Sequence, residues 1–282
     1  MTKTRSGKTK ESRTEKTMLL VESSASESET SIVPLGMIEG KPETEIEYAR
    51  YVESLIERHS VHPVTNILEL TVRSSEFPEM RLELPPKYKT TRVFVSPNIS
   101  GIGEREDNSV IIVGEDYRFP DLKDSFDCII LSYGSFGFAL TERAIHNFLS
   151  TLKDHLKPNG IIIGESYHLG GVYRDACSKS GHRNWVQFRS PVSQQLVTRL
   201  SISHLNIESG ILSSSVRYAY EEVRDQKEKT KIEAYAIRVF SFPELTRSLR
   251  LAGFHRVGFY KTSSHDAPTF KTFKFAFVAE KL

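Results

Sequence analysis

Five short apolar runs between Thr65 and Ser166 constrain the fold of this chain more than any other feature. In order they read TNILEL, TRVFVS, SVIIVG, DCIILSY and GIIIGES. Each is a continuous apolar run rather than an alternation of apolar and polar residues, which is typical of strands buried on both faces. Helical or turn-rich segments separate the runs. The sequence therefore predicts an α/β domain whose parallel sheet is covered by helices on both faces.

Three other segments have the periodicity of helices. Residues 43–58 and 141–156 each carry one apolar stripe. The second of them ends at KPNG, where Pro158 and Gly160 predict a turn into the next strand. The third, SFPELTRSLRLAGF, has Ser241 in the position of an N-cap.

The C-terminal half changes character. Residues 194–241 are rich in Ser, Thr, Tyr, Val and Ile and partly alternate, which predicts antiparallel strands with one solvated face. Two further strands, RVGFYKT and FKFAFVAEKL, end the chain. We expect one domain, residues 32–282, in which residues 190–241 form an antiparallel insert or lid.

The N-terminal segment, residues 1–31, has a basic half followed by a half rich in Ser and Glu. Neither half can bury enough apolar surface to offset the entropy lost on ordering, so we expect a disordered tail. A contact of the basic half with nucleic acid or a membrane is the alternative. The net charge of the whole chain, +2, is too small to favour a nucleic-acid partner.

The order of these elements resembles the class I S-adenosylmethionine-dependent methyltransferases, especially small-molecule enzymes with an antiparallel insert after the fifth strand. The motifs that carry the resemblance are FDCIILSYGSFGFALTERAIHNFLSTLKDHLKPNGIIIGES and FPELTRSLRLAGFHRVGFY. The resemblance implies a Rossmann-like fold with a mostly parallel seven-stranded sheet. It also implies S-adenosylmethionine (SAM) as the cofactor if the protein is active, and none if it is not.

The sequence departs from this family where the cofactor should lie. In the family the first strand ends in an acidic residue followed by three alternating glycines, which permit positive φ and a close approach to the ligand. With the acidic residue at Glu69, the glycine positions hold Thr71, Arg73 and Ser75. We expect a degenerate cofactor loop. The charge of Arg73 could still meet the methionine carboxylate, which is the best argument for a rebuilt site.

Two neighbouring segments depart as well. Pro78, Pro85 and Pro86 fall where the family has its first crossover helix, so we expect a short or missing helix across residues 76–90. The second strand ends in Ser96 and Pro97, where the family usually has an acidic residue for the ribose.

Other positions match the family. Asp116, with Tyr117 beside it, corresponds to the acidic residue at the adenine end, and Tyr133 and Gly134 follow the fourth strand. The resemblance therefore implies a cofactor-binding set of Glu69, Arg73, Asp116, Tyr117, Tyr133 and Gly134. Structural alternatives stay open: Asp116 as a solvated residue at a strand end, and Tyr133 as a ring packed on the sheet edge.

The catalytic candidates are His168 and Tyr133. His168 follows the fifth strand, where ligands bind in open α/β sheets, and it could deprotonate an acceptor hydroxyl or amine. A structural or exposed histidine is the alternative. Methyl transfer also proceeds without a base when donor and acceptor are held in line.

Composition excludes several other classes. The two cysteines, Cys128 and Cys177, form neither a disulfide framework nor a metal cluster, which favours a reducing, cytoplasmic setting. No apolar run reaches membrane-spanning length. Phosphate-loop, nucleophile-elbow and His-Glu-x-x-His motifs do not occur.

Two functions remain. We expect a catalytically silent protein with the methyltransferase fold that acts as a binding or scaffold subunit; the alternative is a divergent active enzyme that methylates a small molecule. The insert has more apolar strand residues than one core can cover. We therefore expect a homodimer or a heteromeric complex through the insert, in which charged residues at Tyr218 and Tyr235 would disrupt assembly. A lid that only contributes to its own core is the other interpretation.

Overall fold

A computed structural model of the chain describes residues 42–72, 82–96, 110–113, 122, 125–168, 181–189, 195–220, 230–262, 264–272 and 274–282. The chain divides into two units, residues 1–31 and 32–282, and the first lies outside the described residues. The expectation of a disordered tail therefore remains a prediction.

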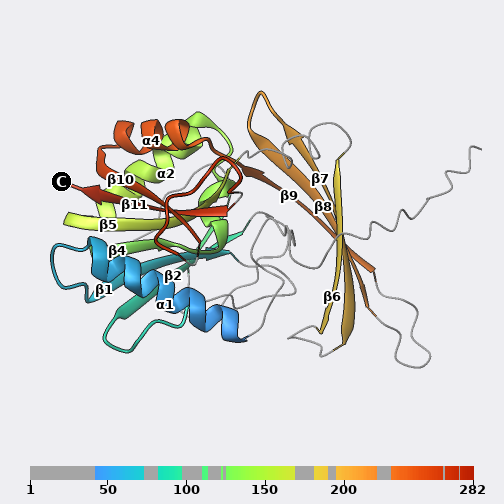
Figure 1. The fold of residues 1–282 in the computed structure, drawn as a ribbon, viewed down its shortest axis with the longest axis horizontal. Coiled ribbons are helices and arrows are strands. Elements are labelled where there is room, and N and C mark those ends of the chain that lie inside the picture. The colour runs from blue at the N-terminus through green and yellow to red at the C-terminus, as the bar shows by residue number, and fades with distance from the viewer. Residues whose placement is uncertain are drawn as a thin grey trace, which may run out of the picture. The chain divides into compact units, whose positions relative to one another are not determined.

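The larger sheet has seven strands in the order β10-β11-β5-β4-β1-β2-β3. Figure 1 labels six of them, all except β3. The five apolar runs of the sequence form β1 (Asn66–Val72), β2 (Lys89–Ser96), β3 (Val110–Val113), β4 (Phe126–Leu131) and β5 (Leu156–Tyr167). These five strands are parallel, and β11 (Lys274–Lys281) is antiparallel to both β5 and β10 (Phe254–Lys261). The expected mostly parallel, seven-stranded α/β sheet is confirmed.

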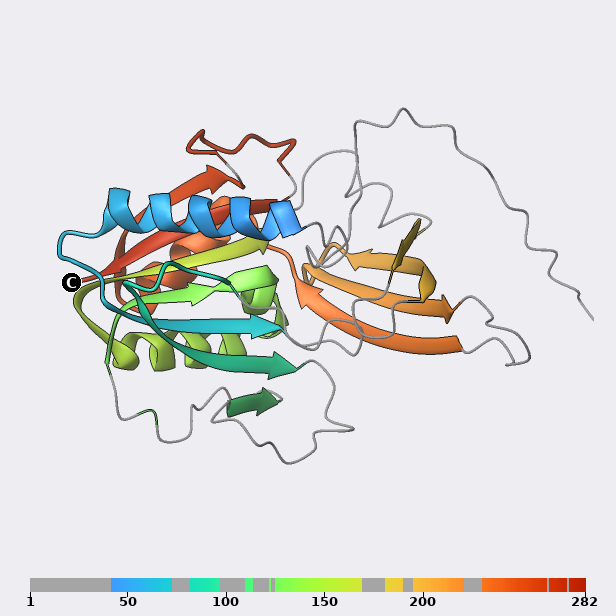
Figure 2. The same ribbon diagram turned by 90° about the horizontal axis from the view of Figure 1, so that it is seen from below.

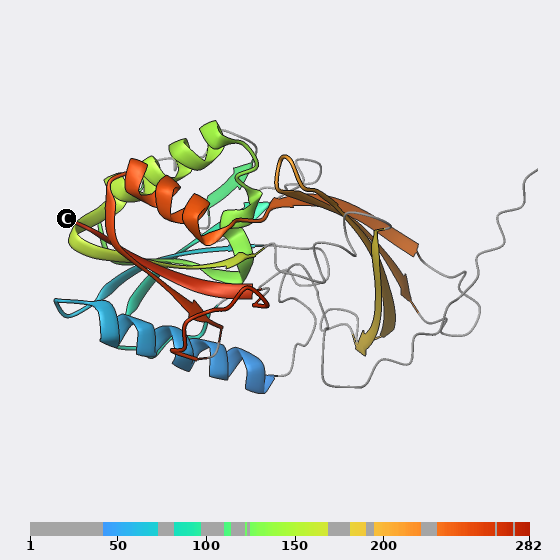
Figure 3. The same ribbon diagram turned by 45° about the horizontal axis from the view of Figure 1, so that its top comes forward.

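The three expected helices are also confirmed, and they cover both faces of this sheet. On one face, α1 (Pro42–His59) buries Val52 and Leu55 in a cluster with Ile67 of β1. On the other face lie α2 (Glu142–His155) and α4 (Phe242–Leu251), with the sheet between the two layers in Figure 3. The continuous apolar runs follow from this arrangement, because each strand needs apolar side chains in both directions.

A second, antiparallel sheet follows β5 in the sequence, as expected for the insert. Its strands, in spatial order, are β6 (His182–Arg189), β7 (Leu196–Asn206), β8 (Ile211–Tyr220) and β9 (Thr230–Arg238). The sequence analysis missed β6, which begins eight residues before the expected start of the insert at residue 190. Its sequence, HRNWVQFR, alternates as a strand should, but three of its exposed positions hold Arg183, Gln187 and Arg189.

The two faces of the insert sheet differ in exposure. On β7, residues 197, 199, 201, 203 and 205 are buried, whereas the residues between them are half-buried or exposed. We call the buried side the covered face. It also holds Leu212 of β8 and Ile237 of β9, which join the main core together with Leu205. On the other, outer face, Trp185 and Ile232 are each 68% exposed.

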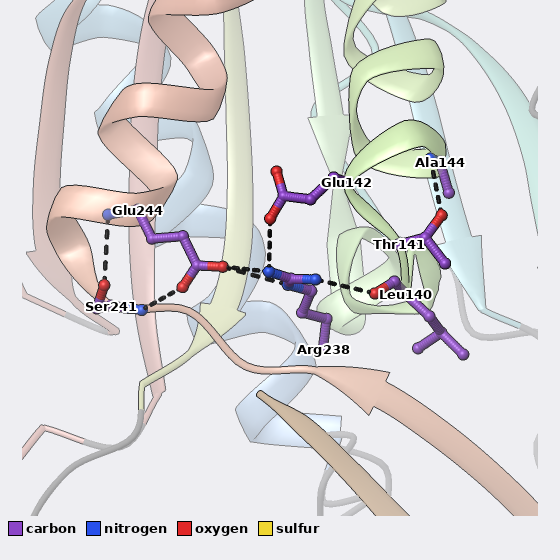
Figure 4. A network of polar contacts seen from close by, with 7 residues as sticks. All are labelled: Leu140, Thr141, Glu142, Ala144, Arg238, Ser241 and Glu244. Carbon is purple, nitrogen blue, oxygen red and sulfur yellow. Dashed lines mark hydrogen bonds and ion pairs between the residues drawn. The ribbon is translucent and has the colours of Figure 1, made fainter. Parts of the chain in front are cut away.

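Arg238, the last residue of β9, fixes the return of the chain from the insert to the main domain (Figure 4). Its guanidinium donates to the carboxylates of Glu142 and Glu244 at 2.8 and 2.6 Å, and to the carbonyl of Leu140 at 3.1 Å. Glu244 also accepts from the backbone of Ser241, which completes a capping box at the start of α4. One arginine thus connects the insert to the N-terminal ends of two helices.

Candidate functional site

The carboxyl ends of β1, β4 and β5 bring three chain segments together at one edge of the large sheet. Parallel pairing places these ends on the same side, where the arrows of β1, β2 and β5 point in Figure 2. The segment η1 (Ser132–Phe138), in which a kink interrupts the 3₁₀ structure, follows β4 at this edge, and every one of its residues is buried. Ligands of open α/β sheets bind at such an edge, so the described residues there form the candidate site.

Glu69, the expected acidic residue of the cofactor site, is completely buried and fully occupied by contacts within the protein. Its Oε1 accepts hydrogen bonds from the amide of Leu82 at 2.9 Å and from the hydroxyl of Ser132 at 3.0 Å. Its Oε2 accepts from Nε of Arg92 at 2.8 Å. Burial raises the pKa of this carboxyl, while the Leu82 amide and Arg92 act in the opposite direction.

The strand itself continues where the family begins its glycine loop. Thr71 and Val72 still pair with Phe94 and Val95 of β2, and Thr71 is fully buried. Thr71 is not among the residues with positive φ. The first of the three expected glycine positions is therefore strand, whereas Arg73 and Ser75 lie outside the described residues.

The segment before β2 has no helix in its described part. Residues 82–88 form neither helix nor strand, and Pro86 lies in a turn. The expected loss of helix is confirmed over residues 82–90; residues 73–81 are outside the part that the structure describes.

Tyr133 and Gly134 form a left-handed corner immediately after β4. Their φ angles are 54° and 71°, which is uncommon for a tyrosine and natural for a glycine. A Cβ on Gly134 would lie 2.8 Å from Cε2 of Tyr167, so the close approach of β5 also requires glycine. The Tyr133 ring is 5% exposed and packs against the Tyr48 ring of α1, with their centroids 5.5 Å apart.

An ion pair with a buried carboxylate lies next to this corner. Glu165 of β5, 2% exposed as a residue, contacts Nζ of Lys274 of β11 at 2.8 Å. The Lys274 ammonium also lies over the ring of Tyr48, 5.6 Å from its centroid. Burial and then the charge of Glu165 raise the pKa of the Tyr48 phenol well above its usual value. The sequence analysis did not select Tyr48, Lys274 or Arg92 as site residues, because all three come from distant segments with no motif.

His168, the expected general base, follows β5 directly. Its Nδ1 lies 3.0 Å from the carbonyl oxygen of Phe240, and its ring stacks on Phe242 with centroids 4.3 Å apart. A carbonyl only accepts, so Nδ1 carries the proton, which leaves Nε2 of the neutral ring as an acceptor. This arrangement suits a base, and it equally suits a histidine that joins β5 to the end of the insert.

The remaining expected site residues cannot be placed, because Asp116 and Tyr117, like Arg73, lie outside the described residues. Within the described part, no group of three or more His, Cys, Asp or Glu side chains could hold a metal ion. In that same part, no helix is long and apolar enough to cross a membrane.

Comparison with solved structures identifies the fold. A SAM-dependent methyltransferase from Clostridium acetobutylicum aligns over 84% of this chain and 92% of its own, with 10% sequence identity and a TM-score of 0.59. The sugar N-methyltransferase KedS8 from Streptoalloteichus aligns over 94% and 98%, with 13% identity and a TM-score of 0.58. This chain has the class I methyltransferase fold. DesVI from Streptomyces venezuelae aligns over 84% and 92%, with 15% identity and a TM-score of 0.57.

The methyltransferase fold explains the order of the seven strands and the position of the insert between β5 and α4. No protein-family model and no curated protein sequence matches the chain. Function consequently has to be argued from the site itself, because one fold supports many activities.

Proposed function

We propose that this protein is a catalytically silent member of the methyltransferase fold and acts as a binding or scaffold subunit. The observation that carries the proposal is the state of Glu69, whose two carboxylate oxygens are taken by Leu82, Ser132 and Arg92. A ligand that used this carboxylate would have to displace these partners. Each displaced buried group would then lose its hydrogen bond, at about 1–3 kcal/mol per group.

Two further observations support the same proposal. Thr71 stands in a paired, buried strand position where the family has the first glycine of its cofactor loop. The crossover segment has no helix over residues 82–88, the described part that precedes β2. Both observations favour a chain that does not hold SAM in the way the resemblance implies.

Calorimetric titration of the purified full chain with SAM tests the proposal. We expect no binding stronger than about 1 mM and no rise in Tm on addition of SAM. A micromolar dissociation constant, or SAM copurified with the protein and detected by mass spectrometry, would show the proposal to be wrong.

Replacement of Glu69 separates a structural role from a ligand-binding one. Glu69→Ala should lower the Tm, because it leaves the Arg92 guanidinium and the Leu82 amide without their buried partner. The matched control is Glu47→Ala on the exposed side of α1, which should leave the Tm unchanged. If Glu69→Ala kept the wild-type Tm, the argument from Glu69 would fail.

The second candidate function is a divergent methyltransferase acting on a small molecule, and the orientation of His168 favours it. The hydrogen bond from Nδ1 to Phe240 leaves Nε2 able to accept a proton at the carboxyl end of β5. The test is release of S-adenosylhomocysteine from SAM in the presence of small amines or alcohols, compared between wild type and His168→Asn. Turnover that His168→Asn abolishes would establish this function over the first.

A binding subunit needs a partner surface, and the outer face of the insert offers one. Trp185, Leu200, Arg217 and Ile232 lie opposite one another in a row across β6, β7, β8 and β9. The first and last members of this row are 68% exposed. We propose that a partner subunit, either a second copy of this chain or a different protein, covers the row.

Tyr218 and Tyr235, the residues expected at that interface, lie on the covered face of the insert instead. Tyr218 is 3% exposed and lies on the covered face, with Tyr235 half-buried on the same side. Charged residues there would disturb the core of the insert, so Trp185 and Ile232 replace them as the residues to test. The cytoplasmic location remains part of the proposal, resting on the small number of cysteines.

A further inference from the structure

The covered face of the insert contains a buried arginine, two of whose nitrogens find no hydrogen-bond partner among the described residues. Arg199 lies in the middle of β7 and is 2% exposed. Its Nε and Nη1 are both shielded from water and make no hydrogen bond. Among the described carboxylates, none forms an ion pair with it. By contrast, the partly buried Arg238 contacts two carboxylates with its guanidinium.

An unpaired guanidinium in this position is costly. Removing a charge from water carries a penalty of several kcal/mol that only a counter-charge and hydrogen bonds repay. Such a group in a folded protein therefore calls for an explanation, and an ion or ligand that binds there is one of the few available.

The surroundings of Arg199 combine polar and apolar side chains. Tyr218 lies directly opposite it on β8, and Ser201 follows it on the same face of β7. Val197 and Val216 pack with Tyr218 in a small apolar cluster on this face. Farther along, the hydroxyls of Ser203 and Ser214 are bonded to each other at 2.8 Å.

We propose that Arg199 is the anchor of a binding site for a small organic anion, with its carboxylate or phosphate group on the guanidinium. The planar fork of arginine presents parallel N–H donors that match both groups. The Val197, Val216 and Tyr218 cluster supplies an apolar wall for the rest of the ligand. The site goes beyond the proposed function, because it lies in the insert and stands whether or not the chain binds SAM.

The first test is ligand binding, with inorganic phosphate and benzoate as probes of the two anion types. We expect each active probe to raise the Tm of the full chain with the logarithm of its concentration, against sodium chloride at equal ionic strength. If only phosphate acts, the ligand is a phosphate compound; if only benzoate acts, it is a carboxylate. If neither raises the Tm, the proposal is wrong.

The second test is substitution. Arg199→Gln should lower the association constant of the active probe about tenfold to hundredfold, because charge-assisted hydrogen bonds are lost. Arg199→Lys keeps the charge but lacks the planar guanidinium, so its affinity for the probe should lie between those of wild type and Arg199→Gln. The matched control is Arg183→Gln, on the adjacent strand β6 and exposed, which should leave the affinity unchanged. Equal losses in Arg199→Gln and Arg183→Gln would indicate nonspecific charge and overturn the site.

Stability in the absence of ligand distinguishes a ligand site from an internal ion pair. Arg199→Met replaces an uncompensated charge by an apolar chain of similar length, so it should raise the Tm in phosphate-free buffer and abolish the response to the probe. Glu233 occupies a position of β9 opposite Val216 and is the internal alternative as a counter-charge. If Arg199→Met and Glu233→Gln both lowered the Tm, the guanidinium would be a structural ion pair and the proposal would fail.

Discussion

At the scale of single residues, Asp127 shows how one carboxylate orders the start of the large sheet. Its Oδ2 accepts hydrogen bonds from the amides of Thr65 and Asn66 at 3.0 and 2.8 Å, and its Oδ1 contacts Nζ of Lys157 at 2.7 Å. It therefore connects the beginnings of β1, β4 and β5. Partial burial raises the pKa of this carboxyl, but Lys157 and the two amides outweigh burial, so the net direction is down.

Asp127→Asn should destabilise the protein at neutral pH by about 1 kcal/mol, because the asparagine loses the charge that these donors favour. The folded pKa lies below the unfolded one, so the contribution of Asp127 is complete above the unfolded pKa and disappears as the pH falls through the folded one. Urea unfolding of wild type and variant at pH 7 and pH 3 measures this. The difference in the free energy of unfolding between wild type and variant should be smaller at pH 3 than at pH 7, and an equal difference at both values would contradict the prediction.

The sequence predicted some individual site residues but not the residues that contact them. It placed an acidic residue at the end of β1, since a strand followed by Glu is a local pattern. It did not find the partners of Glu69, which lie 13, 23 and 63 residues away in Leu82, Arg92 and Ser132. Arg199 was also missed, because an arginine in an alternating strand carries no local sign of which face it occupies.

At the scale of elements, the spacing of apolar residues was sufficient to locate a helix where the segment is long and regular. All three helices begin and end within three residues of the expected segments. The KPNG turn takes a different form: β5 begins at Leu156 and bulges, with Asn159 at φ 61° and a register shift against β4. The local sequence predicts that the chain bends at KPNG. The pairing with β4 places this bend within β5 rather than before it.

The corner at Tyr133 and Gly134 gives a prediction at this scale. Gly134→Ala should lower the free energy of unfolding by about 1–3 kcal/mol, since its φ is positive and its Cβ would meet the Tyr167 ring at 2.8 Å. Chemical denaturation of the variant measures the loss. In a Tyr167→Leu background, Gly134→Ala should cause a smaller loss in the free energy of unfolding, because the contact of the new Cβ with the Tyr167 ring is then removed. Additive losses would show that Tyr167 does not determine this corner.

At the scale of the whole domain, the order of elements carried more information than any motif. Five buried runs, three helices and two late strands in this order carried the resemblance that implied a mostly parallel seven-stranded sheet. The structure has such a sheet. What the sequence could not show is how residues of the insert divide between its two faces. A strand has one covered and one exposed side, and a shift of one residue exchanges them.

The outer face of the insert carries the last prediction, which concerns association. Trp185→Glu with Ile232→Glu should convert an assembled protein to monomers, because both side chains are 68% exposed and lie in one row across the sheet. Their exposure also means that the Tm should hardly change. Light scattering at micromolar concentration measures the mass, and Gln187→Glu, exposed on the same face of β6, is the control.

A wild-type protein that is strictly monomeric, and recovers no partner in a pull-down from its native source, would remove the scaffold role. If the double variant unfolds instead, these residues belong to the core of the insert and a different surface must carry the interaction.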